Sequence, residues 1–412
     1  MLSVAIVDGY STGRYLAQLL RSRGVRLVHV RSQPSVADYF SRGFEPAVYS
    51  CDLGFVADPV ELSVALRAAN VGRVVAGTES GVVLTDTLNH LLSLPGDDPA
   101  TRTARRDKAA MARTVAAAGL AVPAGAVFGD AVQARDWYAG SGLREVVVKP
   151  LRSAGSDHVR FCADAASVQA AAVAVLSSTN LYGERNDEVL VQERLVGTEY
   201  YLNTVSHEGI HAVAEVWRYS KLEGPDGAPI YDFEEPLGPD DDVVHDLKRF
   251  VFLVLDALGV RSSAAHTEVM VTAGGPVLIE CGARLGGATM PEVVEKYTGA
   301  SQAGLLVQAL LDPTAVTRFD DGWAVPTASV RNVSLINPTA GAVRSQRWRA
   351  GLESLPTLVA MAVSLPTGTH LGPTVDLLSS PGYVYLAAEA PEDVLRDHAQ
   401  LRRLERSGIY TS

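Results

Sequence analysis

The chain has 412 residues, of which 47% are hydrophobic and 20% charged, as is usual for a globular protein with a sizeable core. Its 47 acidic and 36 basic residues give a net charge of -11. This argues against a nucleic-acid or anionic-membrane binder, because both need a basic surface. The three cysteines, Cys51, Cys162 and Cys281, are widely spaced, and no apolar run suggests a signal peptide or a membrane span. We therefore expect a cytoplasmic protein without disulfides.

The N-terminal region is predicted to form an open α/β layer. An apolar run at residues 4–7 is typical of a buried parallel strand, and a glycine turn, a helix and a second strand follow it. Another strand is predicted around residues 71–78. The turn between Gly9 and Gly13 lacks a full G-x-G-x-x-G pattern, so it gives a dinucleotide site little support. The segment "LPGDDPATRTARRDK" marks a boundary, and residues 1–104 are assigned to a first domain.

Three further regions follow. Residues 105–187 are predicted to form a small lobe with a helix, strands in "AGAVFG", "EVVVKPL" and "VRFC", and an Ala-rich helix. Residues 188–320 are predicted to form a larger lobe of strands and a helix, including "AAHTEVMVT" and "GPVLIEC" joined by a hairpin turn at Gly274-Gly275. Residues 321–412 are strand-rich and close with a helix that begins near Pro391.

Two carboxylates stand on the strands of that predicted hairpin. Counting outwards from the turn places Glu268 opposite Glu280 or one pair away, so a near-opposite pairing puts both on one face, about 5 Å apart at Cβ. Two such carboxylates repel each other unless a cation compensates, and Mg²⁺ prefers one or two carboxylates plus substrate phosphates. The alternative is a hairpin with two solvated glutamates. Arg284 favours an anion site, because arginine matches a phosphate or acyl-phosphate bidentately, and Gly286-Gly287 would let backbone N–H groups approach that anion.

Basic residues and a small loop suggest a grip on phosphates. Lys149 ends a very apolar strand, and the loop Ser153 to Ser156 follows it, with Gly155 inside. Such a loop can cover phosphates through N–H groups and hydroxyls, although most Gly/Ser turns are only turns. Lys108 begins a helix, where a cation opposes the helix dipole; a bound phosphate would compensate, and a solvated lysine is the alternative.

The segment "VQERLVGTEY" would complete a nucleotide site. Glu193 and the backbone that follows it lie at a strand end, where N–H and C=O groups can read an adenine edge. Glu199 can accept hydrogen bonds from two ribose hydroxyls, as acidic residues do in other nucleotide sites.

One motif in the chain points to a different chemistry. "HEGIH", residues 207–211, matches the H-E-x-x-H zinc pattern. That pattern needs a helix to bring both histidines to one face. Here the flanking segments are predicted strands and Glu208-Gly209 their turn, so we expect no zinc site.

The order of these pieces resembles the ATP-grasp superfamily of carboxylate–amine ligases over most of the chain. The resemblance implies an α/β and α+β architecture, the ATP-grasp fold, in which an N-terminal Rossmann-like domain precedes two lobes that clamp ATP with Mg²⁺, or alternatively Mn²⁺. It implies catalytic roles for Arg284, Lys149 and Glu280, and metal binding by Glu268 and Glu280. The implied nucleotide contacts are Lys108, Lys149, Ser153, Gly155, Ser156, Glu193, Leu195 and Glu199.

Within this superfamily, the chain is similar to bacterial L-amino acid ligases. Many members carry an asparagine where this chain has Gly282, whereas those ligases have a small residue there, and they share "HTE" and a methionine, here Met290. The resemblance implies an amide bond formed through an acyl-phosphate, with release of ADP and phosphate, and a homodimer as one assembly. The expected substrate contacts are Glu79, Trp217, Lys221, Gly286, Gly287 and Met290, and the alternative for Trp217 is an ordinary core or surface aromatic residue.

Two alternatives remain open from the sequence. The chain could be a carboxylase or a purine-pathway type of ligase. Because Gly282 removes one expected metal ligand, it could also be a nucleotide-binding regulator without turnover. We expect small-molecule substrates if the chain is an amide-forming ligase, a carboxylase or a purine-pathway type of ligase. We expect no nucleic-acid or membrane partner in any of these cases.

Overall fold

The N-terminal domain is a parallel sheet with strand order β3-β2-β1-β4, flanked by helices. The computed structural model describes residues 2–36, 41, 43–224, 229–319 and 322–411. The continuous apolar run of the first strand is buried on both faces, as expected for a parallel sheet covered by helices. The elements of this domain are β1 (Ser3–Val7), α1 (Gly13–Ser22), β2 (Arg26–Arg31), β3 (Cys51–Phe55), α3 (Pro59–Ala68), β4 (Arg73–Ala76) and α4 (Val82–Leu92).

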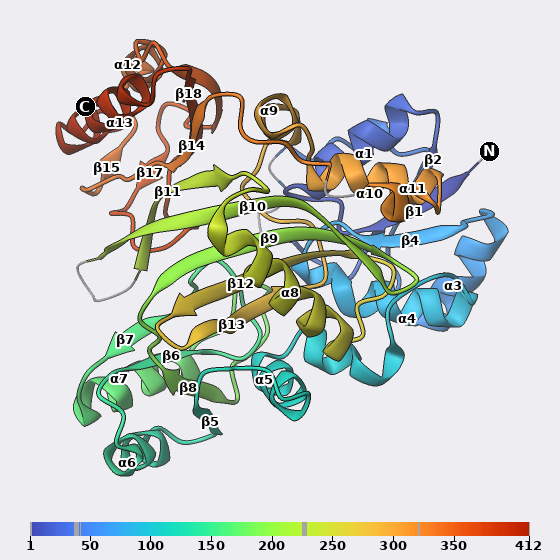
Figure 1. The fold of residues 1–412 in the computed structure, drawn as a ribbon, viewed down its shortest axis with the longest axis horizontal. Coiled ribbons are helices and arrows are strands. Elements are labelled where there is room, and N and C mark those ends of the chain that lie inside the picture. Colours follow the sequence, from blue (N-terminus) through green and yellow to red (C-terminus); the bar gives the residue numbers. More distant parts are fainter. Residues whose placement is uncertain (1, 37–40, 42, 225–228, 320–321, 412) are drawn as a thin grey trace.

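A smaller lobe follows, with an antiparallel sheet in the order β5-β8-β6-β7. Two helices of this lobe bury small apolar residues against the sheet, as Ala134 and Ala172 do. Figure 1 shows this lobe as a separate layer at the lower left. Its elements are α5 (Lys108–Ala117), β5 (Gly125–Phe128), α6 (Ala131–Ser141), β6 (Val146–Pro150), β7 (Arg160–Cys162), α7 (Ala165–Leu176) and β8 (Val189–Glu193).

A long sheet with the order β13-β12-β9-β10-β11-β14-β18-β16 forms the large lobe. Helix α8 is amphipathic and buries Leu247, Val251 and Val254 in the core beneath it. The elements up to residue 318 are β9 (Thr198–His207), β10 (Ile210–Glu223), β11 (Pro229–Leu237), α8 (Asp242–Ala257), β12 (Ala264–Thr272), β13 (Gly275–Gly282), α9 (Pro291–Thr298), α10 (Gln302–Leu311) and α11 (Ala315–Arg318).

The C-terminal region extends this sheet. Strand β14 pairs with β11, and β18 and β16 continue the ladder. The region also has a core of its own, which includes Trp348 and Leu401. Its elements are β14 (Ser329–Ser334), β15 (Gly341–Ala342), α12 (Arg347–Glu353), β16 (Leu358–Val363), β17 (His370–Leu371), β18 (Gly382–Ala388) and α13 (Pro391–Arg406).

Two of the sequence-based boundaries cut through sheets. Strand β8 begins at Val189, in the range assigned to the large lobe, yet pairs with β5 and β6 of the small lobe. Strand β14 lies in the range assigned to a C-terminal subdomain, yet it extends the large sheet. We therefore propose a small lobe that reaches Glu193 and a large lobe that shares its sheet with the C-terminal region.

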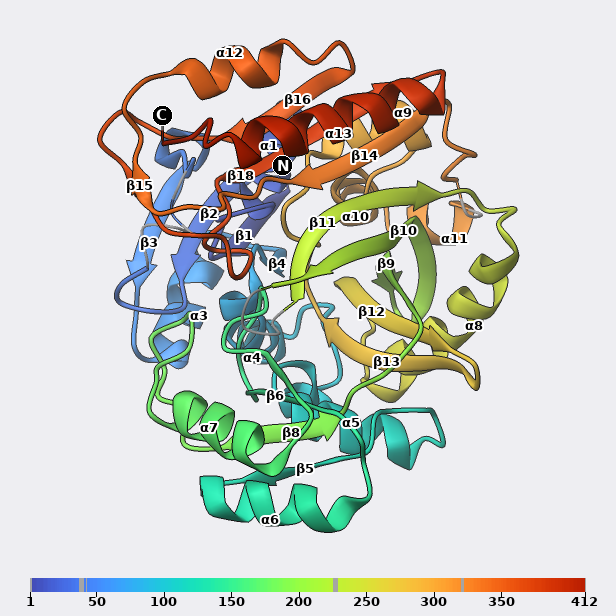
Figure 2. The ribbon, with the colours of Figure 1, turned by 90° about the vertical axis from the view of Figure 1, so that its left-hand side faces the viewer.

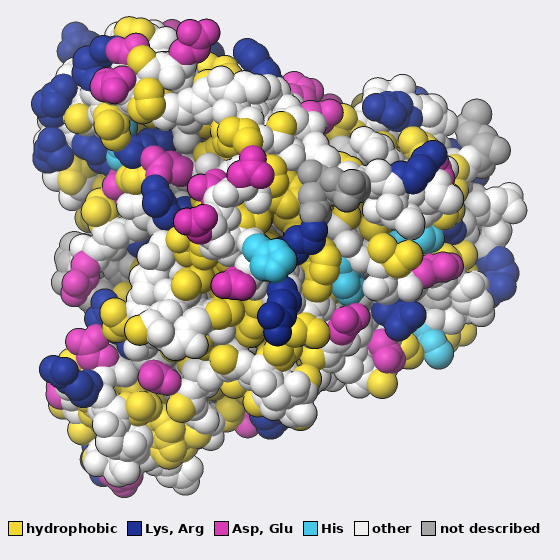
Figure 3. Space-filling view, in the orientation of Figure 1, with side chains coloured by type: hydrophobic (Ala, Val, Ile, Leu, Met, Phe, Trp, Pro, Cys, Tyr) yellow, Lys and Arg dark blue, Asp and Glu magenta, His cyan; other side chains and the backbone are white. Residues whose placement is uncertain are grey.

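The N-terminal domain packs directly on the large lobe. Leu16 and Leu20 of α1 share one core with Leu305 and Leu306 of α10, and Figure 2 shows α1 and α10 from a second side. On the face shown in Figure 3, acidic and basic side chains are interspersed. Across the described ranges, no helix combines the length and apolar character that a bilayer crossing requires.

Candidate active site

The two carboxylates of the hairpin face each other because of a register shift. The turn lies at Ala273-Gly274, one residue earlier than predicted, since Thr272 pairs with Gly275. Uninterrupted pairing from that turn would place Glu268 opposite Ile279. A shift between Glu268 and Val269 instead pairs Glu268 with Glu280. Directly paired residues project from the same face, so the predicted near-opposite pairing of the two acids is confirmed.

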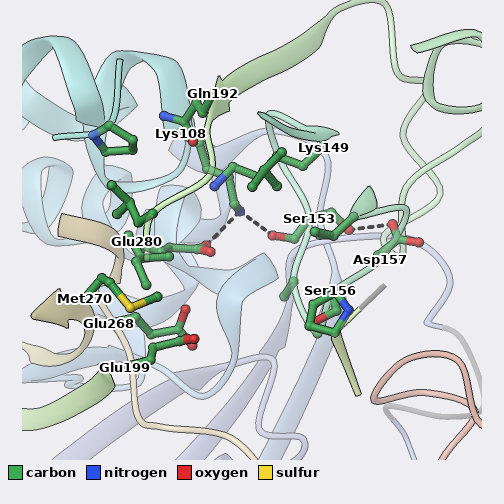
Figure 4. A pocket seen from close by; sticks show the side chains of 18 of the residues that line it. Lys108, Lys149, Ser153, Ser156, Asp157, Gln192, Glu199, Glu268, Met270 and Glu280 are labelled. Atoms are coloured by element: carbon green, nitrogen blue, oxygen red, sulfur yellow. Dashed lines mark hydrogen bonds and ion pairs between the residues drawn. The ribbon is translucent and has the colours of Figure 1, made fainter. Parts of the chain in front are cut away.

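Lys108 lies against one of these acids. It is the first residue of α5, whose N-cap Asp107 accepts hydrogen bonds from two backbone N–H groups. The Lys108 Nζ donates to Glu280 Oε1 and to the Ser153 carbonyl oxygen, both at 2.7 Å (Figure 4). The lysine is buried rather than solvated, and the Glu280 carboxylate offsets its unfavourable place at the positive end of a helix.

Lys149 extends from the end of β6 and is buried nearby. The pKa of Lys149 is lowered to about 8, mainly because the side chain is buried and secondly because Lys108 repels its charge. Two buried lysines that repel each other beside acidic side chains form a site that favours a polyanion.

One cleft collects all residues that the sequence predicted for the nucleotide. It encloses about 1130 Å³, part of which is open to solvent. The sequence-predicted residues that line it are Lys108, Lys149, Ser153, Gly155, Ser156, Glu193, Leu195, Glu199, Lys221, Glu268, Glu280 and Arg284. Apolar side chains from the sheets of both lobes also line the cleft and suit a planar base; they include Val147, Phe161, Met270 and Ile279.

The Gly/Ser loop between β6 and β7 is folded over this cleft. Gly155 and Ser156 both have left-handed backbone angles, with φ of 64° and 62°, which is why glycine suits the first position. The Ser153 hydroxyl donates to Asp157 Oδ2 at 2.6 Å, an anchor that the sequence reading missed. The Leu377 N–H donates to the Gly155 carbonyl oxygen at 3.3 Å. The loop is therefore held by the C-terminal region as well as by its own turn.

Lys221 lies with the nucleotide residues and not in a separate substrate pocket. Its Nζ donates to Glu199 Oε1 at 2.6 Å and lies over the rings of Tyr219 and Tyr231. Burial is the largest single effect and lowers the pKa of Lys221, but Glu199, Tyr231 and Glu268 together raise it more, so the pKa lies above its usual value. The predicted ribose acid is thus already paired with a cation before any ligand arrives.

Arg284 meets an acid from the N-terminal domain. Its Nε donates to Glu79 Oε2 at 2.9 Å, and Arg106 lies 3.8 Å from the other carboxylate oxygen. Burial raises the pKa of Glu79, but Arg284, Arg106 and Lys108 together outweigh it, so the pKa lies below its usual value. A Cβ at Gly282 would lie only 2.8 Å from Glu79 Oε2. The Glu79 carboxylate therefore fills the space that a side chain at position 282 would need.

Several predicted substrate contacts are placed differently. Trp217 is a core residue with 1% of its surface exposed, and its Nε1–H donates to Glu215; its expected substrate role is wrong. The Gly286 N–H donates to Gln302 Oε1, so it is not free to bind an anion as expected, whereas Gly287 is exposed. Met290 caps α9, and its N–H donates to Tyr385.

The zinc pattern in residues 207–211 lies on a β-hairpin and not on the helix that the H-E-x-x-H motif needs. Strand β9 ends at His207 and β10 begins at Ile210, so Glu208-Gly209 is the turn that the sequence predicted. Among the described residues, no group of three or more His, Cys, Asp or Glu side chains could hold a metal. The pair Glu268 and Glu280 could contribute two ligands and would need phosphate oxygens for the rest, which fits Mg²⁺.

Comparisons with known proteins agree with this geometry. A family model described as the ATP-grasp domain matches residues 144–292. Dapdiamide A synthase of Enterobacter agglomerans is 31% identical over 409 residues, covering 98% of this chain and 95% of that protein. The L-amino acid ligase from Bacillus licheniformis superposes with a TM-score of 0.75 at 18% identity, over 98% of this chain and 97% of that one.

A purine-pathway enzyme shares the fold at lower identity. The N5-carboxyaminoimidazole synthetase from Staphylococcus aureus, solved with ADP, has a TM-score of 0.67 at 11% identity and covers 98% of each chain. The predicted ATP-grasp architecture is thereby confirmed.

Proposed function

We propose that this chain, which belongs to the ATP-grasp family of ADP-forming carboxylate–amine ligases, joins an amino acid or another small carboxylate to the amine of an amino acid. One observation carries this proposal. Glu268 and Glu280 pair across two strands and line a cleft that Lys108, Lys149 and Arg284 also line. That combination suits the phosphate chain of ATP beside a reacting phosphoryl group.

The reaction has two steps. The substrate carboxylate attacks the γ-phosphate of ATP, giving an acyl-phosphate and ADP. An amine then attacks the acyl carbon, and phosphate leaves as the amide forms. Phosphoryl transfer asks little covalent chemistry of the protein, so the residues act by positioning and by stabilising charge.

The side chains divide this work. We assign phosphate binding to Lys149 and Lys108, and stabilisation of the acyl-phosphate to Arg284. Glu268 and Glu280 would hold Mg²⁺, which would neutralise phosphate charge when bound. In the free protein, the ion pair of Lys108 with Glu280 keeps one of these acids compensated.

The remaining nucleotide contacts follow the lining of the cleft. We assign adenine to the strand end at Glu193 and Leu195, and the ribose to Glu199. Acyl-phosphates hydrolyse in water, so the site has to be closed during the reaction. The loop with Ser153, Gly155 and Ser156 lies against residue 377, and we propose it as that cover.

We place substrate binding around Arg284 and in the loop that follows it. Glu79 holds Arg284, and Gly287 is exposed on the loop that follows it; both are proposed near the carboxylate. A homodimer and a cytoplasmic location are further proposals, to be checked by light scattering and by fractionation.

The deciding experiment is a phosphate-release screen over all pairs of the standard amino acids, with mass spectrometry of the products. Release of ADP together with a new amide in some pair is the expected result. Adding bicarbonate and aminoimidazole compounds to the panel tests the carboxylase and purine-type alternatives. ATP binding without ADP release in every combination would instead favour the regulator without turnover.

A further inference from the structure

A row of polar side chains crosses one face of the large sheet. In order across the strands, the row consists of Glu280, Glu268, Tyr201, Tyr219, Glu234, Asn332 and Tyr385. Strand register pairs the first three residues in succession and the last four in succession. Directly paired residues project from the same face, and the Tyr201 and Tyr219 rings, 4.8 Å apart, join the two halves. The face that carries the two metal-type acids therefore continues to a third acid, Glu234.

Neutral groups donate hydrogen bonds to Glu234, and both of these bonds end on the same carboxylate oxygen. Its Oε2 accepts hydrogen bonds from the Tyr201 hydroxyl at 2.8 Å and from Asn332 Nδ2 at 3.2 Å. In the part of the chain that the structure describes, no hydrogen bond reaches its Oε1 and no ion pair includes this residue. The residue keeps part of its surface exposed. Glu234 is therefore a firmly oriented carboxylate with one oxygen available and no cation of its own.

Its surroundings disfavour a bare negative charge. Burial raises the pKa of Glu234 to about 7, and neither hydrogen bond fully offsets this. An unpaired carboxylate in such a place is costly, so a ligand cation would be favoured. A primary ammonium group supplies both the charge and up to three N–H donors.

Two hydrogen bonds made by neighbours of this acid lead towards the proposed reaction centre, although Glu234 itself does not line the nucleotide cleft. Beside it in the row, the Tyr219 hydroxyl donates to Glu268 Oε1 at 3.3 Å. The Asn332 Nδ2 that holds Glu234 also donates to the Ala288 carbonyl oxygen at 3.0 Å, in the loop that follows Arg284. Glu234 thus lies on the side of the metal-type acids away from the phosphate lysines. We assign that side to the substrates, because the cleft itself is assigned to ATP.

We propose that Glu234 binds the ammonium group of the amine substrate and accepts one of its protons before the amine attacks. This inference rests on the proposed function. The ammonium passes a proton to the carboxylate, and the freed nitrogen lone pair forms the C–N bond to the acyl carbon. The C–O bond to the phosphoryl group breaks, phosphate leaves with that electron pair, and the second nitrogen proton passes to the departing phosphate.

A neutral nucleophile allows ammonium binding by Glu234 to be tested separately from formation of the acyl-phosphate. Hydroxylamine traps an acyl-phosphate as a hydroxamate, and it is mostly uncharged at neutral pH, so it does not need an ammonium site. We would first find a carboxylate from the standard amino acids that gives hydroxamate with wild-type protein and ATP. The same carboxylate is then supplied with each amino acid as the amine, and Glu234→Gln is compared with wild type in both assays.

The matched control is Glu235→Gln. This neighbouring acid is bound to Arg218 and Arg331, and it projects from the opposite face of the strand. We expect Glu234→Gln to keep hydroxamate formation within about twofold, while the KM for the amino-acid amine rises and amide formation falls on the order of 10²-fold. Glu235→Gln should be close to wild type in both assays.

Two results would overturn the inference. Equal amide formation in Glu234→Gln and wild type would show that no ammonium depends on this acid. Parallel loss of hydroxamate and amide would show a general effect on the site. If wild-type protein formed no hydroxamate with any carboxylate, the ligase proposal itself would fail, a result distinct from both.

Discussion

The Glu79 carboxylate accepts a hydrogen bond from Arg284 Nε at 2.9 Å, across 205 positions of the chain. Glu79 comes from the N-terminal domain and Arg284 from the segment that follows β13, so the contact joins two parts of the fold beside the cleft. A buried acid that holds a partly buried arginine fixes where the guanidinium points.

Replacing Glu79 should therefore slow the reaction more than it weakens ATP binding. We expect Glu79→Gln to lower kcat for ADP release about 10- to 100-fold, because hydrogen bonds to charged groups contribute roughly 1.5–3 kcal/mol. Steady-state kinetics and a nucleotide titration separate the two effects. Glu61→Gln, an exposed glutamate of α3, is the control. Unchanged kcat in Glu79→Gln would refute the positioning role.

Gly282 should tolerate no side chain. A Cβ there would press on the Glu79 carboxylate at 2.8 Å, and overpacking of this kind typically costs about 1–3 kcal/mol. We expect Gly282→Ala to lower Tm and ADP release together, and Gly282→Asn to lower both further instead of adding a metal ligand. Gly140→Ala is the control, because no atom lies within 4 Å of its added Cβ. Full activity in Gly282→Ala would show that the contact is easily relaxed.

The two hairpin acids should control the dependence on magnesium. Glu268→Gln and Glu280→Gln are each expected to lower ADP release on the order of 10²-fold or more, and to raise the Mg²⁺ concentration needed for half-maximal rate. EDTA should abolish the wild-type reaction, and added Mg²⁺ should restore it. A thermal shift with ATP, with and without Mg²⁺, gives a readout that does not depend on turnover. If the Mg²⁺ dependence of both variants equals that of wild type, the metal assignment fails.

Lys149 should make nucleotide binding sensitive to alkaline pH. Its pKa of about 8 in the free protein, lowered by burial and then by Lys108, means that it loses its charge above pH 8. ATP affinity is expected to fall as the pH rises through this value. Lys149→Arg should flatten the profile, because arginine stays charged. An affinity that stays constant from pH 7 to 9.5 in wild type would contradict the expectation.

The same group affects stability in the opposite direction. Because the folded pKa of Lys149 lies below the unfolded value of about 10.5, the unfolded chain binds more protons between pH 8 and 10.5. The contribution of Lys149 to the free energy of unfolding therefore rises with pH in that window. Denaturant unfolding without nucleotide measures it, as the difference between wild type and Lys149→Met.

Arg105 should matter for stability rather than for chemistry. It is fully buried, pairs with Asp86 at 2.7 Å and donates to the Leu258 carbonyl oxygen at 2.8 Å, so it links the N-terminal domain to the large lobe. Removing one partner of a buried ion pair typically lowers the free energy of unfolding by about 3–5 kcal/mol. We expect Arg105→Met to lose about that much in denaturant unfolding, whereas the exposed Arg113→Met should change little. A loss below about 1 kcal/mol would show that the pair is dispensable.

Local pattern was sufficient to predict part of the site. The apolar run before Lys149, the turn signals around Gly274 and the alternation of β12 and β13 identified the strands and the faces of their side chains. Position 217 shows the limit of this reasoning. An aromatic residue in a strand looks the same in sequence whether a ligand or the protein core covers it, and here Trp217 shares a buried core with Val294 of α9.

The amino-acid sequence by itself determined which side chains lie at strand ends, and so the kind of chemistry that these ends can support, because alternation and turn propensity act over a few residues. Only the tertiary structure decided which ends meet. Packing of the N-terminal domain brought Glu79 against Arg284 and Gly282, and one register shift put Glu268 opposite Glu280. Such contacts depend on how whole surfaces fit together, and no short stretch of sequence encodes that fit.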